Sequence, residues 1–195
     1  MMLNDLLTGD GFLSAGAALD SDMSFCARTE AGVRFGRPGG EGMHTHVDHH
    51  DAELLLRLYD LRREEKLRRA REWFGRGFQA RNAEEIDRLC PPGSEENAYV
   101  RMVLSYWDMA ASIVNHGLIE EQFFFENSAE LWYAFERGKV VVALVRERQK
   151  NPHAYENLER LALKYEKWMA ERAPGSIEMR RQQLSAAGRP PEPAK

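Results

Sequence analysis

The feature that most constrains this chain is the stretch from Tyr99 to Trp168, where apolar residues recur at helical spacing through three consecutive segments. Residues three and four positions apart lie on the same face of a helix, so this spacing predicts amphipathic α-helices. Their boundaries are also recognisable, because Ser94 is a preferred N-cap residue and Gly117 suits the left-handed position after a helix end. The pattern predicts an all-α helical bundle.

The same reasoning extends to the whole domain and predicts about four main helices joined by short connections. The first is expected to run from Asp48 or Asp51 to Phe74 as one helix, with Leu56 and Tyr59 on its apolar face. The other main helices are expected over residues 95–116, 129–150 and 152–173, and short accessory helices over residues 83–89, 119–126 and 176–186.

Gly138 lies inside the helix expected over residues 129–150. An interior glycine costs roughly 1 kcal/mol relative to alanine in a helix. We therefore expect a neighbouring helix to approach the backbone closely at Gly138.

Outside the bundle, the chain is expected to be irregular. Residues 1–43 are rich in glycine and lack a helical period, which predicts a flexible extension. The alternative is a small hairpin that pairs residues 23–28 with residues 33–35. The bundle domain is expected over residues 44–175, followed over residues 176–195 by a short helix and a disordered proline-rich tail.

The composition excludes several classes of protein. A net charge of -4 gives no general attraction to nucleic acid or to anionic membranes. Cys26 and Cys90 are far apart in sequence and form no metal-binding or redox motif, so we expect reduced thiols. No apolar run approaches the ~20 residues of a membrane span, and no basic segment precedes an apolar one at the N-terminus. We therefore expect a cytoplasmic protein, with bacteria as its source.

Several motifs carry a resemblance to a known family. They are Tyr106-Trp107-Asp108, Gly117-Leu118-Ile119-Glu120-Glu121, Trp132, Arg146 to Arg148, Tyr155-Glu156-Asn157-Leu158-Glu159 and the opening Leu58-Tyr59-Asp60-Leu61-Arg62-Arg63-Glu64. Together they resemble a family of small helical bacterial proteins catalogued only as a domain of unknown function. The resemblance covers roughly Asp51 to Trp168 and implies a helical fold. It implies no catalytic residue, cofactor or partner, because that family has no agreed activity.

The first candidate site is a cluster of histidines. Four of the six histidines in the chain lie within seven residues, at His44, His46, His49 and His50. Histidine is the commonest metal ligand, and His46 and His50 would share a helix face at i, i+4. The competing interpretation is a set of solvated side chains near a helix start, since a metal site needs a further ligand from elsewhere. Metal binding by this cluster is the first alternative function.

The second candidate site is aromatic and consists of Phe123, Phe124, Phe125, Trp132 and Tyr133. Three consecutive helical residues span about 200°, whereas a helix packed on one side buries a stripe of roughly 100°. The aromatic surface that lies outside this stripe predicts an apolar interface with a protein partner or a second subunit. Core filling within one chain is the alternative. The preferred function is therefore a non-enzymatic interaction or scaffold module that self-associates, most simply as a homodimer.

The third candidate site is the basic first helix. Residues 57–81 contain nine Lys and Arg against four acids, and a basic helical face can bind phosphates. Nucleic-acid binding is the second alternative function. Acidic residues interleave at i, i+4, as in Glu65 and Arg69, so a solvated face of ion pairs is favoured. The chain has no phosphate-binding glycine loop and no nucleophile motif, so no catalytic residue or cofactor is predicted.

Overall fold

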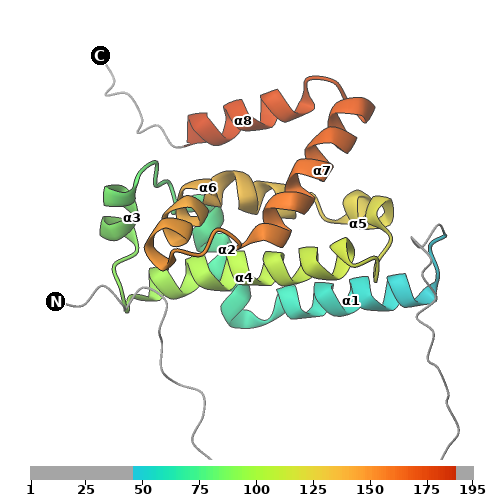
Figure 1. Cartoon of the computed structure of the whole chain (residues 1–195), viewed down its shortest axis with the longest axis horizontal. Coiled ribbons are helices and arrows are strands. Elements are labelled where there is room, and N and C mark those ends of the chain that lie inside the picture. The colour runs from blue at the N-terminus through green and yellow to red at the C-terminus, as the bar shows by residue number, and fades with distance from the viewer. Residues whose placement is uncertain (1–45, 188–195) are drawn as a thin grey trace, which may run out of the picture.

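The computed structural model describes residues 46–187, and this part of the chain folds into eight α-helices with no strand (Figure 1). The helices are α1 (His49–Arg63), α2 (Glu65–Arg76), α3 (Ala83–Leu89), α4 (Glu95–Asn115), α5 (Glu121–Asn127), α6 (Glu130–Gln149), α7 (Glu156–Arg172) and α8 (Ser176–Ala187). The predicted all-α bundle is confirmed. The predictions for the glycine-rich extension, for Cys26, for His44 and for the proline-rich tail lie outside the described residues.

The longest helix, α4, is the centre of the bundle. It packs against α2, α5, α6 and α7, and α1 runs alongside it while α8 lies on the outer side of α7 (Figure 1). Trp107 of α4, Trp132 of α6 and Tyr165 of α7 are among the largest fully buried side chains. Trp168 is half-buried and packs against this core. One hydrophobic core therefore joins α4, α6 and α7.

Most helix ends follow the capping residues that the sequence contains. The side chains of Asp48, Asn82 and Ser94 accept backbone N–H bonds at the starts of α1, α3 and α4. Gly117 follows α4 with φ of 72°, a conformation that is unstrained only without a Cβ. These boundaries agree with the sequence analysis because caps depend on local chemistry.

The first long helix was predicted wrongly, since it is two helices rather than one. The chain breaks at Glu64, whose ψ is 137° and whose side chain accepts two backbone N–H bonds at the start of α2. The break turns α2 so that Leu67 is buried in the core. Leu56 and Tyr59, predicted to be buried on the same face, are exposed on α1. A change of helix direction separates two apolar stripes that are continuous in sequence.

The start of the last long helix also differs from the prediction. Pro152 begins a turn, and α7 starts only at Glu156, after Tyr155 with φ of 55°. Tyr155 provides no side-chain cap, and the carboxylate of Asp108 on α4 accepts the N–H of Leu158 at 2.9 Å instead. A neighbouring helix therefore supplies the cap of α7.

Gly138 marks a close contact between α6 and α4. A Cβ at this position would lie 2.7 Å from Cδ2 of Leu104, closer than two carbon atoms can pack. The expected close approach of a neighbouring helix is confirmed. None of the helices within residues 46–187 is long and apolar enough to cross a lipid bilayer.

Candidate functional site

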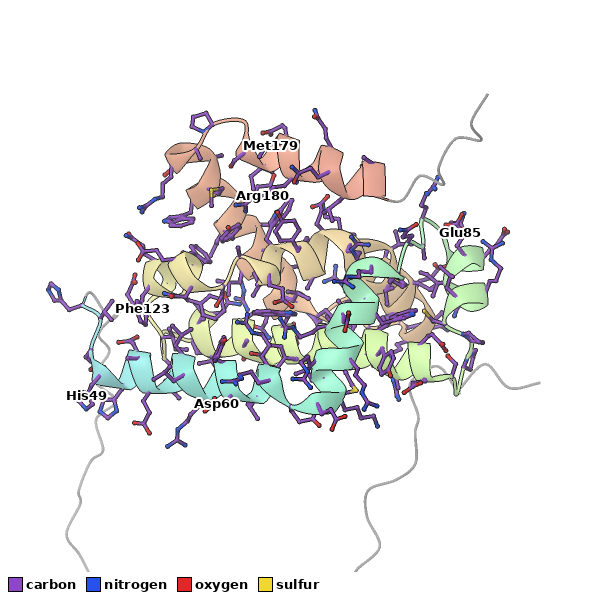
Figure 2. All side chains as sticks on the ribbon, turned by 180° about the vertical axis from the view of Figure 1, so that it is seen from behind. His49, Asp60, Glu85, Phe123, Met179 and Arg180 are labelled. Atoms are coloured by element: carbon purple, nitrogen blue, oxygen red, sulfur yellow. The ribbon has the colours of Figure 1, made fainter. Side chains whose placement is uncertain are left out.

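The candidate site is a groove between α1 and α5, with α4 as its floor, and Asp51 holds its two walls together. The Asp51 side chain is buried, and its Oδ1 accepts the N–H of Glu120 at 2.6 Å, at the start of α5. Its Oδ2 accepts the N–H of Asp48 at 2.8 Å, which completes the capping box of α1. Figure 2 shows this end of the molecule, with His49 on α1 and Phe123 on α5. One carboxylate thus joins the starts of both helices.

The floor of the groove belongs to α4. The Tyr106 hydroxyl donates to the backbone oxygen of Leu58 at 2.7 Å, which fixes α1 on α4. Burial raises the pKa of Tyr106 to about 12, so the phenol remains a hydrogen-bond donor at any physiological pH. Trp107 lies beside it, with the two rings edge to face at 5.0 Å between centroids.

The groove encloses a cavity of about 260 Å³ with mostly apolar walls. It is lined by Leu55, Leu56, Leu58, Tyr59, Arg62, Tyr106, Trp107, Phe124, Asn127 and Ser128. Leu56 and Tyr59 stand on its rim and are 64% and 47% exposed. We call these lining residues the α1–α5 groove. It joins an exposed apolar rim to a partly enclosed apolar cavity.

Two guanidinium groups share one carboxylate next to the groove. Arg71 forms a bidentate ion pair with Glu130 and also donates to the backbone oxygen of Arg62 at 3.1 Å. Arg62 reaches the same carboxylate at 3.5 Å. The two guanidinium groups and the one carboxylate together leave one net positive charge. They hold the end of α1 and the side of α2 against the start of α6.

The structure places the three described histidines of the predicted cluster on the surface. His46, His49 and His50 are exposed, and the rings of His49 and His50 lie 4.0 Å apart between centroids. Within residues 46–187, no group of three or more His, Cys, Asp or Glu side chains is arranged to share a metal ion.

The predicted aromatic interface is not an exposed patch. Phe124, Phe125 and Trp132 are buried inside the chain, while Phe123 and Tyr133 are half-buried against the core. Phe125 packs edge to face on Tyr165 of α7, with 5.4 Å between the ring centroids. Phe124 instead points into the chain as part of the α1–α5 groove. The packing of Phe125 on α7 corresponds to the alternative of core filling within one chain.

The basic side chains of α1 and α2 lie among acidic partners. Arg57, Arg69 and Arg76 each pair with a glutamate at i, i+4 on an exposed face. Such pairs are ordinary support for a solvated helix. The interpretation as an ion-pair face therefore fits these three arginines.

A second concavity of about 490 Å³ is more open and lies between α4, the end of α6 and the start of α7. Its one carboxylate, Asp108, already caps α7, and Asn157 in its wall accepts from Asn115. These polar groups serve the fold. The α1–α5 groove remains the candidate site, although sequence analysis missed it because Leu56 and Tyr59 fit the pattern of core residues.

A comparison with known families supports the resemblance found in the sequence. A family model described as "Domain of unknown function (DUF4760)" matches residues 48–168, which include all of the α1–α5 groove. The match confirms the resemblance found in the sequence over nearly the same range. No curated protein and no solved structure matches this chain.

Proposed function

We propose that this chain, which belongs to the DUF4760 family, is a non-enzymatic interaction module that self-associates through the exposed side of α1. One observation carries the proposal: Leu56 and Tyr59 are 64% and 47% exposed on the rim of an apolar groove. Single exposed apolar side chains are common on protein surfaces. Two of them that continue into an apolar groove form the kind of patch that marks an interface.

Covering this rim would release considerable free energy. Fully burying a leucine or a similar apolar side chain is worth about 1.5–3 kcal/mol. Leu56 and Tyr59 lie three residues apart, so one packed helix covers both. Tyrosine also suits interface positions, because its ring packs while its hydroxyl finds a polar partner.

The occupant that we propose is α1 of a second copy, packed antiparallel about a two-fold axis at Leu56. Leu56 is the central residue of the 15-residue helix His49–Arg63. The N-cap residue Asp48 is acidic and exposed at one end of α1, and Arg63 in the last turn is basic and exposed at the other. An antiparallel copy would therefore lay each acidic end beside a basic end, and two-fold dimers are the commonest homo-oligomers.

The test is the oligomeric state of matched variants. Light scattering at high micromolar concentration should show a dimer for the wild type and a monomer for Leu56→Glu, with the helical circular dichroism signal retained. Leu163→Glu is the control, because Leu163 is 52% exposed but lies on α7. A monomeric wild type, or equal loss of dimer in both variants, would refute the proposal.

A further inference from the structure

Trp107 holds a buried donor that lacks an acceptor. Its side chain is 1% exposed, and no acceptor within residues 46–187 reaches its Nε1–H. An unsatisfied buried polar group costs about 1–3 kcal/mol, so native proteins rarely retain one without a use. The indole is part of the floor of the α1–α5 groove.

A cation with spare donors lies beside this indole. A guanidinium carries five N–H donors. Within residues 46–187, Arg62 donates one hydrogen bond, of 3.5 Å to Glu130. Its side chain is 16% exposed. Glu130 cannot neutralise it fully, because Arg71 already holds that carboxylate in a bidentate pair. The groove therefore has an unbalanced positive charge and unused donors at one end.

These hydrogen-bond donors and several apolar side chains belong to the same small cavity. The guanidinium carbon of Arg62 is 5.8 Å from the ring centroid of Trp107, and both residues line the cavity of about 260 Å³. Leu55, Leu58 and Phe124 form apolar walls around it. The site thus offers donors and positive charge for a head group, and apolar walls for a short body.

We propose that the α1–α5 groove binds a small apolar carboxylate. The carboxylate accepts hydrogen bonds from Nε1 of Trp107 and from Arg62, and its hydrocarbon part packs on Leu55, Leu58 and Phe124. A single negative charge balances the excess left by two guanidinium groups and one carboxylate, and a planar carboxylate suits a guanidinium. This site is built by one chain, so the inference does not rest on self-association.

The cavity volume limits the size of the ligand. Drug-sized ligands occupy pockets of about 300–1,000 Å³, and this cavity lies just below that range. An aromatic acid such as phenylacetate or a medium-chain acid such as octanoate matches it better than a nucleotide. These two acids are therefore the probes for the test.

The test is calorimetric titration of the full chain with phenylacetate and octanoate, and with phenylacetamide and octanamide as neutral counterparts. Each acid should bind at least about tenfold more tightly than its amide, which corresponds to about 1.4 kcal/mol. Trp107→Phe keeps an aromatic ring but removes the pyrrole ring with its N–H donor, and Arg62→Met keeps an unbranched apolar stem and removes the charge. Both variants should weaken acid binding at least about fivefold. Arg62→Met should weaken amide binding much less than acid binding, because an amide carries no charge, whereas Trp107→Phe should weaken both, since an amide oxygen also accepts from Nε1.

Arg57→Met is the matched control, because Arg57 is an exposed arginine of the same helix that pairs with Glu53. It should bind the acids like the wild type. Equal affinity for acid and amide overturns the proposal, as does the absence of acid binding at millimolar concentration or an equal effect of Arg57→Met and Arg62→Met. The acid-to-amide comparison needs no variant, so a substitution that fails to fold leaves the proposal testable.

Light scattering on the same samples separates this inference from the proposed dimer. Trp107→Phe alters a side chain in the floor of the groove and leaves the exposed side of α1 unchanged, so it should retain the dimer while losing acid affinity. A monomeric wild type that binds the acids would refute self-association alone. A dimer that binds neither acid would refute the carboxylate site alone.

Discussion

Gly138→Ala tests how tightly α6 packs on α4. In most helices this substitution stabilises the protein by roughly 1 kcal/mol, since alanine restricts the unfolded chain and favours the helix. Here the new Cβ would lie 2.7 Å from Cδ2 of Leu104, which is fully buried and has little room to move. Overpacking of a core typically costs about 1–3 kcal/mol. We expect the clash to outweigh the propensity and to lower the free energy of unfolding by about 1–2 kcal/mol.

Gly75→Ala is the matched control for helix propensity. Gly75 lies in α2, and a Cβ at that position would meet nothing within 4 Å. It should stabilise the protein by about 0.5–1 kcal/mol. The two glycine substitutions are therefore expected to change stability in opposite directions.

Urea denaturation followed by circular dichroism measures both changes. The clash should vanish in a Leu104→Ala background, which removes each Leu104 atom that the new Cβ would approach. Gly138→Ala should then stabilise that background, which gives a coupling of about 2–3 kcal/mol between the two sites. If Gly138→Ala stabilises the wild type as much as Gly75→Ala does, the reasoning about this helix contact is wrong.

Two further predictions concern titratable groups. Burial raises the pKa of Cys90 to about 11. In a Cys26→Ser background, iodoacetamide should therefore label the native protein slowly at pH 8 and the urea-unfolded protein quickly. Fast labelling of the native protein would show that Cys90 is accessible. The hydrogen bond from Arg148 holds the pKa of Asp87 below its ordinary value, so this pair stabilises the fold above about pH 4 and ceases to do so as the pH falls through the folded-state pKa. Because Asp87 is 46% exposed, Asp87→Asn should lower the free energy of unfolding by at most about 1 kcal/mol at pH 7 and should not change it at pH 2. Urea denaturation at both pH values measures this difference. An equal loss of stability at pH 2 would contradict the role of the Asp87–Arg148 pair.

Several features of the candidate site could be recognised only in the tertiary structure. Trp107 lies in a segment whose spacing of apolar residues predicts an amphipathic helix, and it is buried. That its N–H lacks an acceptor, and that Arg62 lies over its ring, depends on how α1 and α4 cross. Leu56 and Tyr59 follow the helical period of core residues, yet the break at Glu64 leaves them on the rim of a groove. Helical periodicity identifies an apolar face and does not say what covers it.

What the sequence alone determined is the set of helices and most of their ends. Asp48, Asn82, Ser94 and Gly117 act through bonds and dihedral angles within a few residues, so local chemistry is enough to predict them. Tertiary structure alone decided which charges meet. Glu130 lies 59 residues after Arg71 in the chain, and only the packing of α6 beside α2 brings them together. The charge excess and the cavity arise from that packing, because contacts between distant segments follow from helix directions that no local pattern encodes.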